Sequence, residues 1–281
     1  MADQEPDGFA EYWTTDEDSP SHVYHDVLIA LDESRGINNG QPSLWAYIFD
    51  HLDLVPGEQV LHLGCGTGYY SAIIAELVGS AGRVTAVEID ATLAQNARAA
   101  LADWPQVRVI NADGAHTSFE PVDAIVASAG ATHPLSSWLD ALEPGGRLLF
   151  PMTTSRNGPG AMLLVSRRPD DGFAARFLCR AGFIDFQGAR DPAISRRLAA
   201  ALRRDQGAAV KSLRRDTHTE MRLAGSMARV GACPVVNLTI EPPGTAPLHD
   251  NLGATRPILI PPISRSLPFR VGDCQFRPPH F

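Results

Sequence analysis

The chain has 281 residues, 44% of them hydrophobic and 20% charged, with a net charge of −8; it is long enough to bury a full core and still carry appendages. No stretch approaches the roughly 18 consecutive apolar residues of a membrane span, and the acidic start MADQEPDGFAEYW lacks the basic and apolar regions of a secretion signal. The four cysteines form no CxxC pair, which argues against a zinc site or a disulfide framework and predicts a cytoplasmic protein without a bound metal.

The negative charge is concentrated at the start of the chain. Residues 1–18 hold seven acidic residues and no basic one, in an unpatterned stretch that predicts a disordered tail. Residues 190–215 hold eight basic and two acidic residues. A solvated helix face explains this basic stretch better than a nucleic-acid site does.

The elements before residue 59 are predicted to form an N-terminal helical cap over 19–58. Ser19-Pro20 is a helix-start signal, and Val23, Val27 and Leu31 follow at helical spacing, which predicts a helix to about Ser34. The Gly/Asn-rich loop RGINNGQ comes next. A second amphipathic helix is predicted from about Pro42.

From Gln59 to residue 190, apolar strands alternate with helices. The predicted strands are 60–64, 84–89, 107–110, 123–128 and 147–150, and the predicted helices are 69–78, 91–103 and 135–142. Near-continuous apolar strands separated by helices indicate an α/β fold with a parallel sheet covered on both faces. The expected architecture is a Rossmann-like, mostly parallel seven-stranded sheet.

The end of the chain carries weaker patterns. Residues 161–167 and 173–179 predict an antiparallel pair of strands that completes the core. Residues 192–213 predict a helix interrupted by Gly207, and 241–281, with nine prolines, predict an irregular tail. Together 191–281 form a predicted helical and proline-rich extension.

The motif with the most chemical content is Gly64-Cys65-Gly66-Thr67-Gly68-Tyr69, between the first core strand and its helix. Glycines there let the chain turn sharply and let a ligand lie against bare backbone. A dinucleotide fingerprint would need its third glycine at Tyr69, so the GxGxG spacing favours S-adenosylmethionine, which has no pyrophosphate.

Two further strand ends supply polar side chains. Glu88 ends the next strand, where a carboxylate accepts hydrogen bonds from ribose hydroxyls, and Asp113 follows the third strand, placed for the adenine amino group. The predicted cofactor-binding set is completed by neighbours of these positions: Cys65, Thr67, Tyr69, Ile89, Gly114 and Ser128. His62 lies inside an apolar strand and is predicted to be a core histidine.

Residues 36–186 resemble the protein-L-isoaspartate O-methyltransferase family of class I S-adenosylmethionine-dependent methyltransferases. The matching stretches are GQPSLWAYIFDHLDLVPGEQVLHLGCGTGYYSAIIAELVG, VEID and VDAIVASAGATHPLSSWLDALEPGGRLLFPM. The resemblance implies that the three glycines contact the cofactor, that Glu88 binds ribose and that Asp113 lies near adenine. It also implies that loop 36–43 helps to cover the methyl-transfer site.

The sequence departs from this family in that loop. The family's Thr-Ile-Ser stretch, whose hydroxyls help to hold the substrate carboxylate, is replaced by Ile37-Asn38-Asn39-Gly40, with Gly40 at the position of the serine. Asn38 and Asn39 are the predicted acceptor-binding residues, since their amides suit a carboxylate, although Asn before Gly is also turn chemistry. His133, after the fourth strand, is the candidate base or contact.

The leading functional hypothesis is methylation of a carboxylate on a peptide or protein. Two alternatives stay open: a small-molecule O- or N-methyltransferase, and a non-catalytic module that binds S-adenosylmethionine. A nucleic-acid methylase is disfavoured, because Ser128-Ala129-Gly130-Ala131 stands where an Asn/Asp-Pro-Pro-aromatic motif would follow the fourth strand. The acceptor and the oligomeric state are not specified by the sequence.

Overall fold

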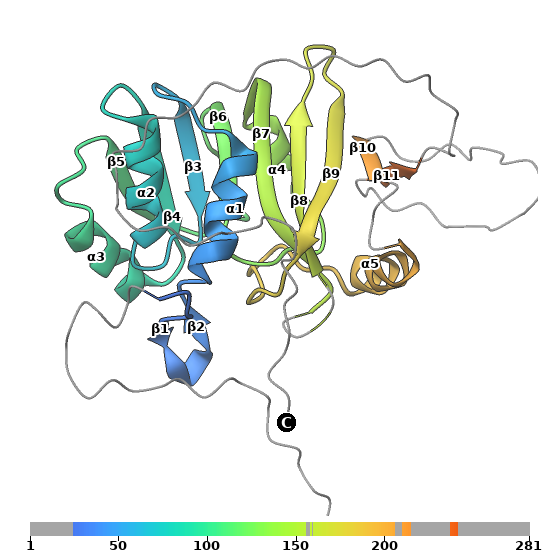
Figure 1. Ribbon diagram of the computed structural model, residues 1–281, viewed down its shortest axis with the longest axis horizontal. Helices are drawn as coiled ribbons and strands as arrows, with labels where there is room; N and C mark the ends of the chain where they lie inside the picture. Colours follow the sequence, from blue (N-terminus) through green and yellow to red (C-terminus); the bar gives the residue numbers. More distant parts are fainter. Residues whose placement is uncertain (1–24, 156–157, 159, 206–209, 215–236, 241–281) are drawn as a thin grey trace, which may run out of the picture. The chain divides into compact units, whose positions relative to one another are not determined.

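A computed structural model describes residues 25–155, 158, 160–205, 210–214 and 237–240. Within them a nine-stranded sheet runs in the order β11-β10-β9-β8-β7-β6-β3-β4-β5 (Figure 1). The pairs from β5 through β7 are parallel, and the pairs from β7 through β11 are antiparallel. A separate two-stranded sheet, β1-β2, precedes the core. The predicted tails, 1–18 and 241–281, lie outside the described residues.

The bounds of the elements follow the chain order. The strands are β1 (Ala30–Asp32), β2 (Ile37–Asn38), β3 (Gln59–Leu63), β4 (Arg83–Glu88), β5 (Val107–Asn111), β6 (Val122–Ala127), β7 (Leu142–Thr153), β8 (Gly160–Arg167), β9 (Phe173–Arg180), β10 (Val210–Arg214) and β11 (Asn237–Ile240). The helices are η2 (Glu33–Arg35, a single 3-10 turn), α1 (Pro42–Leu52), α2 (Tyr69–Val78), α3 (Ala91–Ala100), α4 (Ser136–Asp140) and α5 (Pro192–Asp205).

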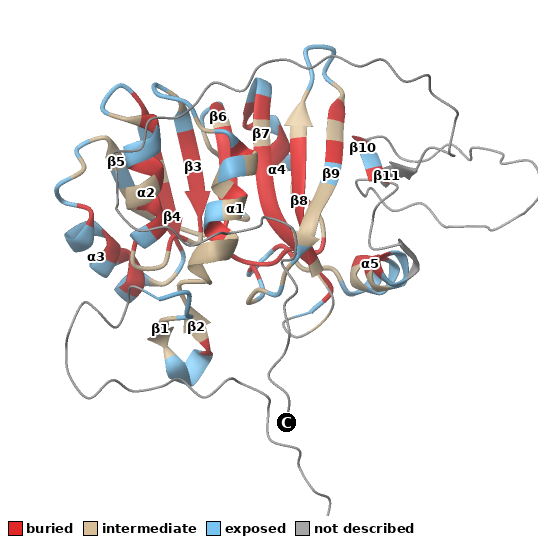
Figure 2. Ribbon diagram, in the orientation of Figure 1, coloured by how far each residue is buried: buried red, intermediate tan, exposed pale blue. Residues whose placement is uncertain are grey.

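The predicted α/β class is confirmed, and the core elements lie within a few residues of their predicted bounds. Along β3 and β4, alternate side chains enter different layers. Val60 and Val84 pack with α1 and α2 on one face, whereas Leu61, Leu63 and Val87 pack with α4 and α5 on the other. Figure 2 shows the buried strands between partly exposed helices. Burial on both faces is why these strands are almost entirely apolar.

The N-terminal helix prediction is wrong where the structure tests it, because residues 25–38 form a bend, β1, η2 and β2 instead. Asp26 accepts hydrogen bonds from the Ser43 N–H and the Gln41 amide. Asn39 pairs with Ile29 through both its backbone and its side chain. These contacts with the start of α1 outweigh the local helical pattern, and Val27, expected on the buried face, is 44% exposed.

The predicted helix over 192–213 is correct only as far as Asp205. Residues 210–214 form β10, which pairs with β9 through Ser212 and Leu213. Val210 and Leu213 are buried against the sheet, so the pairing of an exposed sheet edge overrides the weak helical pattern beyond Gly207. With β10 and β11 the sheet has nine strands where seven were expected.

No helix in the described part of the chain is long and apolar enough to cross a membrane.

The C-terminal end of α1 is fixed to the sheet by Arg147 of β7. Its guanidinium donates to the Leu52 and Asp53 carbonyls at 2.8 and 3.0 Å and binds both oxygens of Glu58 at 2.8 and 2.9 Å. The Arg147 side chain is 19% exposed and that of Glu58 12%, so solvent screens this bidentate pair only weakly.

Replacing Arg147 with Ala is expected to lower the free energy of unfolding by roughly 2–3 kcal/mol, because it leaves a poorly hydrated carboxylate and two carbonyls without their hydrogen-bond donor. Urea denaturation measures the loss. Arg176→Ala, at an exposed position of β9, is the matched control and is expected to change stability by less than about 0.5 kcal/mol. Equal effects of the two substitutions would contradict the assigned role of Arg147.

Candidate active site

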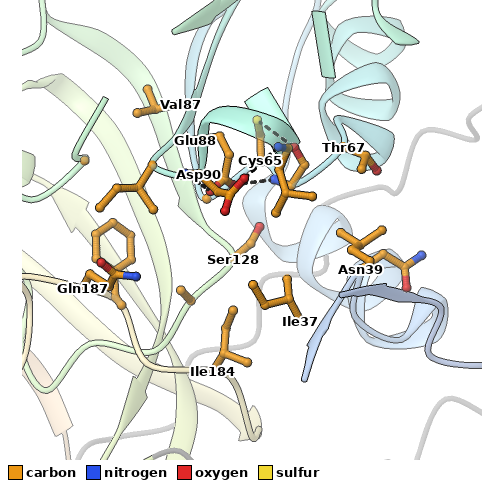
Figure 3. Close-up of a pocket in the computed structure, with 18 of the residues that line it drawn as sticks. Ile37, Asn39, Cys65, Thr67, Val87, Glu88, Asp90, Ser128, Ile184 and Gln187 are labelled. Atoms are coloured by element: carbon orange, nitrogen blue, oxygen red, sulfur yellow. Dashed lines mark hydrogen bonds between the residues drawn. The ribbon is translucent and has the colours of Figure 1, made fainter. Parts of the chain in front are cut away.

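A cavity of about 270 Å³ opens at the carboxyl ends of β3, β4, β5 and β6. The strand order reverses at β3, which lies between β4 and β6, and open α/β sheets bind their ligands at such a point. The cavity is lined by residues from four strand ends, from the β1-β2 hairpin and from the segment after β9 (Figure 3).

The glycine loop after β3 is one wall of the cavity. Gly64, Gly66 and Gly68 have φ values of 74°, 58° and 92°, a left-handed conformation that side chains disfavour. A Cβ at Gly66 would lie 2.9 Å from Leu31 Cδ1, and one at Gly68 would lie 2.6 Å from Leu101 Cδ1. The loop is therefore a close-fitting cradle of bare backbone. Gly64 and Gly66 line the cavity, whereas Gly68 caps the start of α2 behind it.

Glu88 places a buried carboxylate at the end of β4. Its Oε2 accepts from the Gly66 N–H at 2.8 Å and its Oε1 from the Asp90 N–H at 3.0 Å. The side chain is only 6% exposed, and no ion pair with it is found among the described residues. Burial raises the pKa of Glu88, and the backbone hydrogen bonds oppose that shift only in part. Its remaining acceptor capacity suits hydroxyl donors of a ligand.

The strand end after β5 forms the next part of the wall. Asp113 accepts from the Ala115 N–H at 2.8 Å and lies 2.8 Å from His116 Nδ1. Burial alone would raise its pKa, but the hydrogen bonds from His116 and Ala115 lower it, so Asp113 is a stable carboxylate. The buried Trp138 indole donates to the Gly114 carbonyl at 2.8 Å and so fixes this turn to the core.

The β1-β2 hairpin covers the cavity from the side of α1. The Asn38 side-chain oxygen accepts from the Gly40 N–H at 2.9 Å, and that of Asn39 accepts from the Ile29 N–H at 2.9 Å. Both asparagines line the cavity, but Figure 3 shows the Asn39 carboxamide turned away from its centre. Tyr70 of α2 donates its hydroxyl to the Gly40 carbonyl at 3.1 Å and so holds the loop on the core.

The other predicted cofactor-binding residues are also in the wall. Cys65, Thr67, Tyr69, Ile89, Gly114 and Ser128 all line the cavity. The Cys65 thiol is a passive part of it, because burial and the nearby Glu88 raise its pKa to about 12.

His133 is not among the residues that line the cavity. After β6 the chain pairs Gly130 with Asp185 and Ala131 with Met152, and it turns so that His133 Nδ1 lies 2.9 Å from the Thr132 hydroxyl. Burial lowers the pKa of His133, which leaves a neutral imidazole beside the site. The predicted contact with cofactor or acceptor thus has no support from its position.

Two parts of the wall were not predicted from the sequence. Leu31 and Arg35 come from the hairpin, and Ile184, Asp185, Phe186 and Gln187 come from the segment after β9. That segment is held to Gly130, just beyond the end of β6, by backbone hydrogen bonds, from Gly130 N–H to Ile184 O at 2.7 Å and from Phe186 N–H to Gly130 O at 2.9 Å. No hydrophobic periodicity marks residues that reach the site by such pairing. The only sequence feature at this place is the stretch GFIDFQGARD, residues 182–191, which contains all four of the residues after β9.

The wall fits S-adenosylmethionine. The left-handed backbone of the glycine cradle disfavours side chains, which close neighbours also exclude at Gly66 and Gly68, and the buried Glu88 carboxylate offers acceptors to a ribose without a competing cation. The described residues contain no group of three or more His, Cys, Asp or Glu side chains arranged to hold a metal ion. This strand order with this site defines the class I S-adenosylmethionine-dependent methyltransferases.

Comparison with known proteins narrows the class to a family. The sequence profile of the protein-L-isoaspartate(D-aspartate) O-methyltransferase family matches residues 11–189. The protein-L-isoaspartate O-methyltransferase of Methanothermobacter thermautotrophicus is 31% identical over 61% of this chain and 80% of its own. That of Brucella anthropi is 32% identical over 62% and 79%. The chain therefore belongs to the protein-L-isoaspartate(D-aspartate) O-methyltransferase family.

Solved structures agree with this assignment. A protein-L-isoaspartate O-methyltransferase structure superposes with a TM-score of 0.55 at 26% identity, over 60% of this chain and 56% of that one. A second structure, of a β-aspartate methyltransferase from Plasmodium falciparum in complex with S-adenosyl-L-homocysteine, gives a TM-score of 0.53 at 16% identity, over 60% and 84%. The second likeness concerns the fold alone.

Replacing Glu88 with Ala is expected to weaken S-adenosylmethionine binding by roughly 1–3 kcal/mol, because it removes charge-assisted hydrogen bonds to the ribose. Since the pKa of Glu88 is raised, protons compete with the ligand for this carboxylate. The affinity of the unsubstituted protein should therefore fall as the pH is lowered from neutral toward the ordinary pKa range of a glutamate, and the fall should begin above that range. Isothermal titration calorimetry over this range measures both effects.

The matched control is Glu120→Ala, at an exposed position outside the cavity wall, which should bind as the unsubstituted protein does. An affinity unchanged in Glu88→Ala, or the same pH dependence with and without the carboxylate, would rule out the ribose assignment.

Replacing Gly40 with Ser is expected to destabilise the protein beyond the ordinary cost of a left-handed residue. Gly40 has a φ of 76°, and a Cβ there would lie 2.5 Å from Nε1 of Trp45, a fully buried ring stacked on Tyr70. Gly57, with a φ of 94° and nothing within 4 Å, is the matched control. Gly57→Ser measures the backbone strain alone, about 1–2 kcal/mol, and Gly40→Ser should cost roughly 1–3 kcal/mol more.

Urea denaturation of both variants gives the difference. If the two substitutions cost the same, Trp45 moves aside, and steric exclusion by its indole is not what requires glycine at position 40.

Proposed function

We propose that this protein transfers the methyl group of S-adenosylmethionine to a carboxylate of a peptide or protein. The proposal is carried by one observation: the cavity wall contains no histidine and no lysine in the described part of the chain. A carboxylate is already a nucleophile near neutral pH and needs no base, whereas a phenol or an ammonium group must first lose a proton. Family membership supports the same acceptor class.

The carboxylates described in the wall are already bound to other groups of the protein. Glu88 is held by backbone N–H groups, and Asp113 is held by His116. Asp185 lies 3.4 Å from the Arg190 guanidinium and is paired with it. None of these carboxylates is arranged as a general base, so the wall suits an acceptor that arrives ionised.

The acceptor is proposed to enter between the β1-β2 hairpin and the segment after β9. Ile37 and Ile184 contribute apolar surface on these two sides, and the Gln187 carboxamide is turned toward the cavity in Figure 3. An amide beside apolar surface suits a peptide group next to a side chain.

When bound, S-adenosylmethionine supplies the reactive methyl group on its sulfonium, and the chain supplies position. The glycine loop and Glu88 hold the adenosine part, and the hairpin and the segment after β9 confine the acceptor and exclude water. Alignment of this kind supplies a large share of the rate acceleration in displacement reactions.

Isoaspartyl peptide incubated with isotopically labelled S-adenosylmethionine is expected to gain an alkali-labile methyl ester, detected by mass spectrometry. The same peptide with ordinary aspartate is the control for the acceptor, and Glu88→Ala is the control for cofactor dependence. Ester on either peptide, formed more slowly by Glu88→Ala at limiting cofactor, supports carboxylate methylation, and the ratio between the peptides identifies the preferred acceptor.

Absence of ester on both peptides and on an aged protein mixture, with cofactor binding confirmed by calorimetry, would overturn the proposal. The acceptor would then be a small molecule, or the protein would bind the cofactor without methyl transfer.

A further inference from the structure

β3 carries a histidine in an otherwise apolar strand. His62 is 1% exposed and lies between Leu61 and Leu63, on the face of the sheet that packs against α1 and α2. Burying an imidazole is costly unless both of its nitrogens find partners. The partners therefore indicate what the residue does.

Both ring nitrogens are hydrogen-bonded to serine hydroxyls. Nδ1 lies 2.8 Å from the Ser71 hydroxyl in α2, and Nε2 lies 2.7 Å from the Ser128 hydroxyl at the end of β6. Ser71 is completely buried, whereas Ser128 lines the cofactor cavity. Figure 3 shows Ser128 in the middle of the wall, between the Glu88 side and the hairpin side. His62 thus connects the interior of the protein with the cavity.

The chemistry of the three groups fixes the direction of the hydrogen bonds. Burial lowers the pKa of His62 to about 3, so the ring is neutral and has one donor and one acceptor nitrogen. The buried Ser71 hydroxyl must donate its hydrogen, and His62 Nδ1 is the acceptor within reach. The proton of the imidazole then resides on Nε2, which donates to Ser128. The Ser128 hydroxyl is left to donate its own hydrogen into the cavity.

The ring has little freedom to leave this geometry. Trp45 packs edge-on against His62 with ring centroids 5.9 Å apart, and Trp45 itself stacks on Tyr70 at 4.3 Å. On the other side, the Ser128 N–H donates to the Leu63 carbonyl at 2.9 Å, which fixes the serine backbone. Rigid packing of the supporting residue and a fixed backbone at the supported one are what hold a polar group at a site.

We propose that His62 is a positioning residue that fixes the Ser128 hydroxyl as a hydrogen-bond donor to the bound cofactor. The proposal rests on the cofactor site described above and is independent of the acceptor. Ser128 stands beside the glycine loop, where a Cβ on Gly64 would lie 3.9 Å from Ser128 Cβ, and it lines the cavity that the cofactor would fill.

A double-mutant cycle tests the proposal with S-adenosylhomocysteine as the ligand, so that neither acceptor nor turnover is needed. Ser128→Ala and His62→Leu are each expected to raise its Kd about five- to tenfold, the cost of one neutral hydrogen bond. The double variant should bind no more weakly than Ser128→Ala alone, because His62 acts through the serine. Losses that multiply in the double variant, or a Kd unchanged in His62→Leu, would overturn the proposal.

Two measurements keep the test decisive if His62→Leu does not fold. His62→Gln retains an amide N–H₂ that can donate to Ser128 and is expected to bind within about twofold of the unsubstituted protein. In the unsubstituted protein, ¹⁵N NMR of labelled histidine should show a neutral ring with its hydrogen on Nε2; a hydrogen on Nδ1 would refute the assigned direction. Intact coupling together with failed peptide methylation would reject only the proposed acceptor.

Discussion

The hydrogen bond from the Gly66 N–H to the Glu88 carboxylate joins the two segments on which the site depends. It requires a left-handed turn after β3, which glycine permits, and a carboxylate at the end of the neighbouring strand, which the parallel register of β3 and β4 supplies. The carboxylate is buried without a counter-charge and its pKa is raised, so at neutral pH it costs the ligand-free protein stability. The apolar layers on both faces of the sheet and the Arg147–Glu58 pair at its opposite end offset that cost.

The cavity joins walls of different origin. The cofactor side is made of strand ends, whose positions follow directly from the sheet order. The proposed acceptor side is made of a hairpin and of a segment after β9, each attached to the core by specific hydrogen bonds: Tyr70 to Gly40, and Gly130 to Ile184 and Phe186. If the proposed acceptor side is correct, this division would let one fold keep its cofactor while its acceptor changes, and the Asn38-Asn39-Gly40 loop would be one such change.

The sequence predicted the parts of the molecule that repeat a local pattern. The parallel strands, α2 and the GxGxG loop were located correctly, because apolar runs and glycine spacing are properties of neighbouring residues. The helix expected before Ser34 was wrong, since Asp26 and Asn39 bond to distant partners that no local pattern contains. β10 was missed for the same reason, and Ile184–Gln187 reach the cavity by pairing with Gly130, more than fifty residues earlier. His62 was correctly placed in the core, but its link to Ser128 depends on two strands and a helix meeting in space.

The way the segment after β9 is attached has an evolutionary consequence. Gly130 holds it through main-chain atoms, and a Cβ at Gly130 would lie 2.2 Å from the Thr153 hydroxyl, so this anchor tolerates little change. The side chains of Ile184 and Gln187 take no part in that anchoring. Selection can therefore exchange them one at a time, altering the proposed acceptor side of the cavity while the backbone of the wall stays in place. Divergent members of such a family would keep the glycine and vary beside it.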